Sequence, residues 1–367
     1  MRLFVFGSSI TSSYWNGAAT YYRGLYKQLH VLGHSITFAE PDAYGRQQKR
    51  DPGDYSYVES LVYRSEHDIP LLLEKAAGCD LVIKHSGIGV FDRLLEESVL
   101  ECRSAPTRVA FWDVDAPATL ARVEADKGDA FRPLIPEYDF VFTYGGGPPV
   151  VEHYQRLGAA NCYPIYNALD PETHHPEAPD PDLACDLVLV ANRLPDRERR
   201  VEEFFLRAAV QAPEMKFILG GEGWGGKAMP ANVRWIGHVS TCDHNRVNCS
   251  ARMVLNLNRD SMAGVGFSPP TRIFEAAGAG ACVVTDRWSG IERFFAPDCE
   301  ILVAASAEEI VHHLRSCSAE QGRAIGDRMR KRALREHTYK LRAAEFDAIV
   351  ARERETASNR SELMARG

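Results

Sequence analysis

Short apolar runs alternate with amphipathic stretches along the first 170 residues of the chain. Residues 17–32 have apolar side chains at helical spacing and are followed by Gly33, which is typical of a helix that ends before a strand. The apolar runs on either side have the length of buried strands, and they lie at residues 3–6, 35–39, 80–84, 108–112, 139–143 and 161–165. This alternation predicts a Rossmann-like domain, with helices packed against a parallel sheet, over residues 1–170.

The alternation stops at residues 171–182, which contain four prolines and no apolar periodicity, and this predicts a linker. It then resumes, and a second doubly wound domain is expected over residues 183–336. The expected strands of this domain lie at residues 186–191, 216–219, 233–236, 253–257 and 281–285. Residues 337–367 are charged and helical in pattern, with Phe346 and Val350 among the few apolar positions. We expect this tail to pack back onto the first domain.

Composition and net charge argue against some classes of function. The chain has 367 residues, a net charge of −7 and 25% charged residues, so it has no general attraction for nucleic acid. No apolar run approaches the roughly 18 residues of a membrane span, and the sequence enters a strand directly after Met1. The nine cysteines are scattered without a Cys-x-x-Cys pair, which is typical of reduced thiols. We therefore expect a cytoplasmic protein.

The segment 266–286 carries the clearest chemical signal. Pro269 and Pro270 suit the first turn of a helix, and an apolar strand follows that helix and ends at Asp286. Arg272 and Glu275 are three positions apart, so they lie on one side of the helix. One can meet a phosphate and the other a ribose hydroxyl pair, which suggests a nucleotide-sugar site. An ordinary surface ion pair on a helix is the alternative, and both interpretations stay open at this point.

The first glycine turn excludes a dehydrogenase. Gly7 and Gly17 are ten positions apart, so this turn cannot form the Gly-x-Gly-x-x-Gly approach to a dinucleotide. The intervening loop is rich in hydroxyl side chains and leads into a helix. We expect Asn16 and Gly17 to face a cleft between the two domains.

Ser268–Gly280 (SPPTRIFEAAGAG), within the segment 266–286, is followed by two shorter motifs at residues 300–303 (EILV) and 336–339 (EHTY). Together they resemble the CgeB-like (spore-maturation-type) glycosyltransferases, whose C-terminal domain is of the group 1 type. The resemblance covers the second domain and the tail, and in the first domain it is mostly architectural. It implies the GT-B architecture, in which two Rossmann-like domains face a cleft and a C-terminal helix crosses back to the first domain.

The resemblance also implies roles for individual residues in donor binding. Glu275 would bind the ribose of the donor. Arg193, which follows the first strand of the second domain, would bind the diphosphate, and Arg197 would assist it. Gly237 and His238 would lie beside the nucleobase. The full donor set is Arg193, Arg197, Gly237, His238, Ser268, Arg272 and Glu275. A solvated basic helix face is the alternative for Arg197. Retaining relatives carry a second carboxylate where this chain has Phe267, so the stereochemical outcome is not assigned.

Catalytic groups are expected at strand ends of the first domain. His85, Asp113 and Asp115 follow predicted strands, and either type of side chain can remove a proton from an acceptor hydroxyl. Capping of the next helix is the alternative role. Gly145 and Gly146 either line the acceptor cleft or form a plain connection.

We expect no metal ion and no cofactor beyond the donor. Asp113 and Asp115 mimic the metal-binding Asp-x-Asp of another glycosyltransferase architecture, but a phosphate site rich in arginine makes a metal unnecessary. The zinc-like set of His238, Cys242, His244 and Cys249 matches no standard ligand spacing.

The sequence thus predicts a glycosyltransferase that uses a nucleoside-diphosphate sugar. The acceptor is undetermined among glycans, lipid-linked molecules, proteins and small molecules. The basic stretch 323–342 allows at most peripheral contact with a membrane. A sugar-nucleotide epimerase of the same architecture and a non-catalytic nucleotide-sugar binder are the alternatives.

Overall fold

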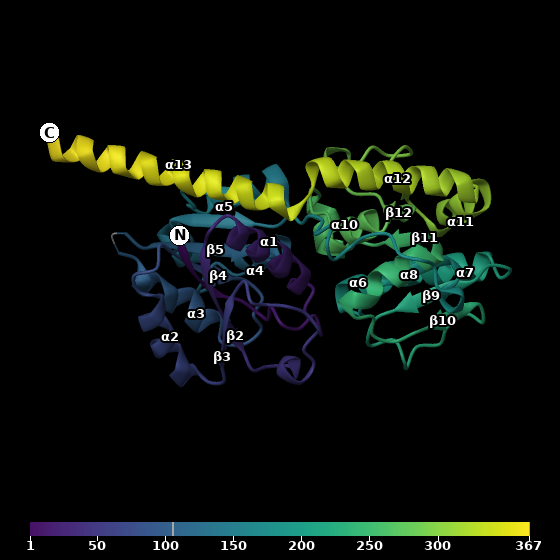
Figure 1. Cartoon of the computed structure of the whole chain (residues 1–367), viewed down its shortest axis with the longest axis horizontal. Helices are drawn as coiled ribbons and strands as arrows, with labels where there is room; N and C mark the ends of the chain where they lie inside the picture. Colours follow the sequence, from purple (N-terminus) through teal and green to yellow (C-terminus); the bar gives the residue numbers. More distant parts are fainter. Residues whose placement is uncertain (105, 367) are drawn as a thin grey trace.

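The computed structural model describes residues 1–104 and 106–366, with side chains through residue 355. Two α/β domains lie side by side, each built on a parallel sheet (Figure 1). Within these residues the first sheet has seven strands in the order β3-β2-β1-β4-β5-β6-β7. They are β1 (Arg2–Phe6), β2 (Ser35–Pro41), β3 (Glu59–Tyr63), β4 (Leu81–His85), β5 (Arg108–Asp113), β6 (Phe140–Thr143) and β7 (Cys162–Pro164). The order reverses between β1 and β4, the point at which wound sheets open toward ligands.

Both faces of the first sheet are covered, which explains its uninterrupted apolar strands. Side chains at alternate positions, such as Phe4 and Val5, belong to separate buried clusters on the two faces. The helices of this domain are α1 (Ala19–Val31), α2 (Ile69–Ala76), α3 (Asp92–Ser98), α4 (Ala116–Ala125) and α5 (Gly147–Arg156).

The second sheet has six strands, in the order β10-β9-β8-β11-β12-β13, among the residues described. They are β8 (Cys185–Val190), β9 (Phe217–Gly220), β10 (Val233–Trp235), β11 (Ala251–Asn256), β12 (Val283–Asp286) and β13 (Leu302–Ala304). Its helices are α6 (Pro195–Arg200), a π-helical turn (Val201–Leu206), α7 (Arg207–Gln211), α8 (His244–Ser250), α9 (Asp260–Val265), α10 (Thr271–Gly278), α11 (Ala307–Ser316) and α12 (Ala319–Glu336). The two Rossmann-like domains predicted from the alternation are therefore confirmed.

The C-terminal helix α13 (Tyr339–Arg366) crosses back to the first domain, as expected (Figure 1). It follows α12 after a break at His337 and Thr338. Tyr339, Ala343, Phe346 and Val350 are buried in the cluster formed by α1 and one face of the first sheet. The tail therefore supplies part of the core of the first domain.

The domains touch through polar contacts beside the cleft. The Gly146 N–H donates to the Phe267 carbonyl at 2.8 Å, and the Asn167 amide donates to the Pro269 carbonyl at 2.9 Å. Both acceptors lie just before α10, so the first domain directly holds the approach to this helix. None of the described helices is long and apolar enough to cross a membrane.

Candidate functional site

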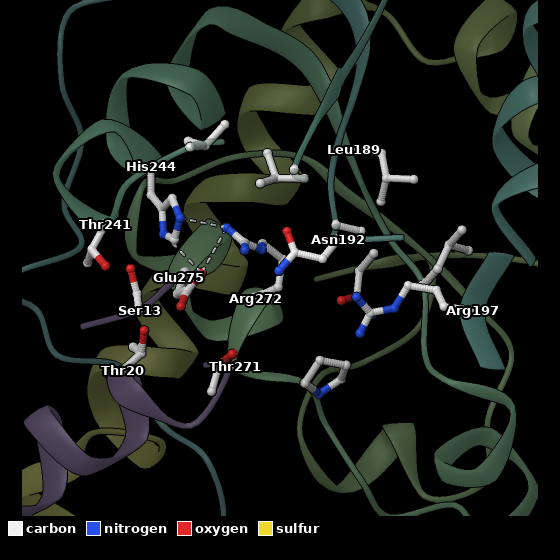
Figure 2. A pocket seen from close by; sticks show the side chains of 18 of the residues that line it. Ser13, Thr20, Leu189, Asn192, Arg197, Thr241, His244, Thr271, Arg272 and Glu275 are labelled. Carbon is white, nitrogen blue, oxygen red and sulfur yellow. Dashed lines mark hydrogen bonds and ion pairs between the residues drawn. The ribbon is translucent and has the colours of Figure 1, made fainter. Parts of the chain in front are cut away.

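A pocket opens between the two domains at the carboxyl ends of β8 and β11 and beside the start of α10 (Figure 2). Its cavity has a volume of about 160 Å³. The first domain contributes Ser13, Asn16, Gly17 and Thr20. The second domain contributes most of the remaining wall, including Asn192, Arg197, His238, Thr241, His244, Thr271, Arg272 and Glu275.

Helix α10 is placed by its own sequence. Pro270 is its N-cap residue, which confirms the helix start predicted from the two prolines. The backbone N–H groups of a first helical turn have no partner within the helix, and together with the helix dipole they attract anions. Arg272 and Glu275, on the first turns, both line the pocket. The helix thus presents donors, a cation and a carboxylate to one cavity.

Arg272, Glu275 and His244 form one charged group (Figure 2). The Arg272 guanidinium lies 3.1 Å from Glu275 Oε2 and 3.2 Å from His244 Nε2, and His244 Nδ1 lies 3.3 Å from the same carboxylate oxygen. Burial alone would raise the pKa of Glu275, but Arg272 and His244 outweigh it and hold that pKa well below its usual value. The two neighbours therefore favour the charged form of Glu275, although only 3% of its side chain is exposed.

Arg197 enters the pocket from α6 with unused hydrogen-bonding capacity. Its Nε atom is buried and has no hydrogen-bond partner. Burial, together with the positive charge of Arg259, lowers the pKa of Arg197 to about 10. A guanidinium in this state attracts an anion, since an uncompensated buried charge is costly.

Of the remaining predicted donor residues, some line the pocket and others lie outside it. Gly237 and His238 follow β10, and His238 lines the pocket. Arg193 instead pairs with Glu198 at 2.7 Å and does not line the pocket. Ser268 is fully buried and donates to the Gly266 carbonyl, so it shapes the turn before α10.

The hydroxyl-rich loop of the first domain is fixed by Asn16. The Asn16 amide donates to the carbonyls of Ser9 and Ser12, and its oxygen accepts a bond from the Ser8 hydroxyl at 2.9 Å. Asn16 and Gly17 both line the pocket, and the Ser13 hydroxyl is buried without a partner. Ser13 and Thr20 point toward the Glu275 end of the cavity (Figure 2).

Two of the predicted catalytic residues, His85 and Asp113, do not line the pocket. His85 is fully buried among aromatic rings, and its Nε2 lies 2.6 Å from the Tyr26 hydroxyl. Burial, reinforced by Lys84, holds the pKa of His85 well below its usual value. Asp113 is also fully buried and accepts hydrogen bonds from Ser86 and Tyr154. Neither side chain faces the cleft, so the expectation that they meet an acceptor is wrong.

Asp115 does face the other domain. Its Oδ2 lies 2.6 Å from the Arg259 guanidinium, whereas its Oδ1 has no hydrogen-bond partner. Burial raises the pKa of Asp115, although Arg259 opposes the shift. Gly145 and Gly146 lie against Ser268 and Phe267 of the second domain, so they are part of the contact between the domains.

The sequence pattern does not identify several pocket residues. His244 figures in the sequence only as part of a zinc-like set, and Thr241 and Asn192 carry no motif. Within the described residues, the group with metal-ligand proximity is His174, His244 and Glu275, which shares only His244 with that set. The sequence gives no signal for this group because its members come from three separate segments.

The comparisons with known proteins agree with this geometry. Residues 197–348 match a family model described as glycosyl transferase-like. No curated protein matches the sequence significantly.

Solved structures match nearly the whole chain. Sucrose-phosphate synthase from Thermosynechococcus elongatus is 11% identical, with a TM-score of 0.69 over 96% of this chain and 98% of that one. HepE from Anabaena, solved with UDP and glucose, is 10% identical, with a TM-score of 0.68 over 96% and 99%. An alpha-glucosyltransferase solved with UDP-glucose and DNA is 13% identical, with a TM-score of 0.67 over 95% and 99%. The chain therefore has the GT-B fold of these glycosyltransferases, and its second domain carries a glycosyl transferase-like sequence.

Proposed function

We propose that this protein is a glycosyltransferase that moves a hexosyl group from a nucleoside-diphosphate sugar to an acceptor. The observation that carries the proposal is the combination of Arg197, Arg272 and Glu275 in one interdomain pocket beside the start of α10. A nucleoside diphosphate needs cations for its phosphates and a carboxylate for its ribose. The fold and the matched family segment support the same function.

Donor binding exchanges one set of partners for another. Without donor, Arg272 and Glu275 neutralise each other at 3.1 Å. With donor, Arg272 turns to the phosphates and Glu275 accepts hydrogen bonds from the ribose hydroxyls. Arg197 gains the anionic partner that its buried Nε lacks. Two guanidinium groups and the start of α10 supply positive charge for the leaving diphosphate, so we propose transfer without a metal ion.

The nucleobase belongs at the end of the pocket near Gly237 and His238. HepE and the alpha-glucosyltransferase were solved with uridine nucleotides, and UDP-glucose is therefore the first donor to test. Arg193 pairs with Glu198 at 2.7 Å and lies outside the pocket, so we propose no direct phosphate contact for it.

The acceptor meets the donor from the first domain. We assign Asp115 as the base, because it is the predicted catalytic residue that contacts the second domain, its buried Oδ1 has no hydrogen-bond partner and its pKa is raised. Arg259, 2.6 Å away, orients the carboxylate.

Calorimetric titration with UDP, UDP-glucose and the corresponding guanosine and adenosine compounds tests the donor site. Arg197→Gln and Arg272→Gln should each weaken diphosphate binding about tenfold or more, since a charge-assisted hydrogen bond contributes about 1.5–3 kcal/mol. Arg199→Gln is the matched control for Arg197→Gln, because Arg199 also lies on α6 and 74% of its side chain is exposed. Wild-type affinity in both pocket variants would refute the assignment. Product analysis then separates transfer from epimerisation or binding alone.

A further inference from the structure

His174 lies directly behind the donor pocket, and its side chain has no hydrogen-bond partner. It comes from the segment that joins the two domains, is 1% exposed, and has both ring nitrogens buried and unpartnered. An imidazole buried in this way is costly unless its nitrogens bind a water molecule, an ion or another ligand.

The backbone around His174 is held in place from several sides. The Asn245 side chain donates to the Thr173 carbonyl at 2.9 Å and accepts from the His175 N–H at 3.2 Å, so it grips the chain on either side of His174. Gly278, at the end of α10, permits the close approach, because a Cβ there would lie 2.6 Å from the His174 carbonyl oxygen. The imidazole is thus positioned by contacts that do not involve its own nitrogens.

Two pocket residues meet His174 at this point. Ligand atoms of His174, His244 and Glu275 all lie within 4.8 Å of one another, and all three side chains are buried. The two imidazoles stack with centroids 5.9 Å apart. Two histidines and one carboxylate, with one side open to a cavity, form the donor set of an open tetrahedral zinc site. Ligands of such a site are about 3.4 Å apart, as follows from bond lengths near 2.0–2.1 Å, so a small contraction would complete it.

We propose that His174, His244 and Glu275 form a site for a transition-metal ion of the zinc class, and that this ion competes with the nucleotide for Glu275. The competition rests on the proposed role of Glu275 in ribose binding. The bound ion would replace Arg272 as the countercharge of the carboxylate. Arg272 can leave, because its side chain is 23% exposed and borders the cleft. Metal binding would therefore inhibit donor binding without taking part in transfer.

The test compares the wild-type protein with His174→Leu. Leucine has a similar volume and removes two nitrogens that have no partner, so the variant should fold with undiminished thermal stability and keep its affinity for UDP in metal-free buffer. Zn²⁺ is titrated against a chromophoric chelator, and UDP affinity is then measured with and without Zn²⁺. Exposed thiols such as Cys242 and Cys299 bind zinc equally in both proteins. Mg²⁺, which prefers oxygen ligands, serves as the control ion.

Wild-type protein should bind one more equivalent of Zn²⁺ than His174→Leu. Zn²⁺ should also weaken UDP binding to the wild type about tenfold or more, but not to the variant, whereas Mg²⁺ should affect both proteins equally. Equal zinc stoichiometry, or an equal effect of Zn²⁺ on UDP affinity in the two proteins, overturns the proposal. If UDP fails to bind the metal-free wild type, the proposed function itself fails, and the zinc stoichiometry still decides whether the metal site exists.

Discussion

Replacing Glu275 with glutamine tests the ribose site directly. The substitution keeps the shape of the side chain and removes its charge, so the fold around α10 should persist. In the wild type the carboxylate is an anion held at low pKa by Arg272 and His244. The ribose hydroxyls would therefore donate to a charged acceptor.

The expected magnitude follows from the two kinds of hydrogen bond. A hydrogen bond to a charged group contributes about 1.5–3 kcal/mol, and one to a neutral group about 0.5–1.5 kcal/mol. Since about 1.4 kcal/mol corresponds to a factor of ten, loss of the 2′-hydroxyl should weaken wild-type binding about 10- to 150-fold. In Glu275→Gln the same loss should cost only about 2- to 12-fold.

Calorimetry with UDP and 2′-deoxy-UDP on both proteins gives the two ratios. Glu203→Gln, a change at an exposed carboxylate of the same domain, controls for the loss of one negative charge. If Glu275→Gln discriminates between the two nucleotides as strongly as the wild type does, Glu275 does not bind the ribose.

Three further changes test the core, the catalytic assignment and the pH dependence. Phe346→Ala should lower stability by about 3–5 kcal/mol in urea unfolding, because the ring is fully buried and stacks on Trp112; an unchanged midpoint would contradict a structural role for the tail. Asp115→Asn should slow transfer about 10²–10⁴-fold while donor affinity stays unchanged, and full turnover would exclude Asp115 as the base. His337 has its pKa lowered to about 4, mainly by burial, so its neutral form stabilises the fold above the unfolded pKa of about 6.5. That stability, about 3 kcal/mol, should be lost as the pH falls from 6.5 to 4, and His337→Asn should flatten this pH dependence.

The strands inside both sheets could be predicted from the sequence, and so could the edge strands β7 and β10, whereas the edge strands β3 and β13 could not. Strands such as β5 and β11 lie inside their sheets, so their apolar runs stand out from the flanking helices. The strand β3 is only half buried and begins with Glu59 and Ser60, while β13 has three residues at the other sheet's edge. An edge strand needs fewer apolar side chains, and the pattern that reveals the others is weak there.

Local signals predicted part of the site in both domains and missed His244, Thr241 and Asn192. Arg272 and Glu275 were predictable because the prolines and the helical spacing both lie within one short segment. His244 was not, because its position beside Glu275 depends on how α8 packs against α10. His85 and Asp113 failed for a related reason: each ends a strand buried on both faces, and sequence alone does not show which strand-end side chain turns outward.

Phe267 shows that a missing carboxylate can reflect packing. Its backbone is in the left-handed region, with φ of 48°, and its side chain fills the space that glycines leave on two sides. A Cβ at Gly147 of the first domain would lie 2.8 Å from that of Phe267, and one at Gly290 would overlap the ring. The Phe267 carbonyl also accepts the bond from Gly146. Position 267 is therefore occupied by the contact between the domains, so the proposed transfer would need its negative charge from another residue, such as Asp115, which pairs with Arg259 of the second domain.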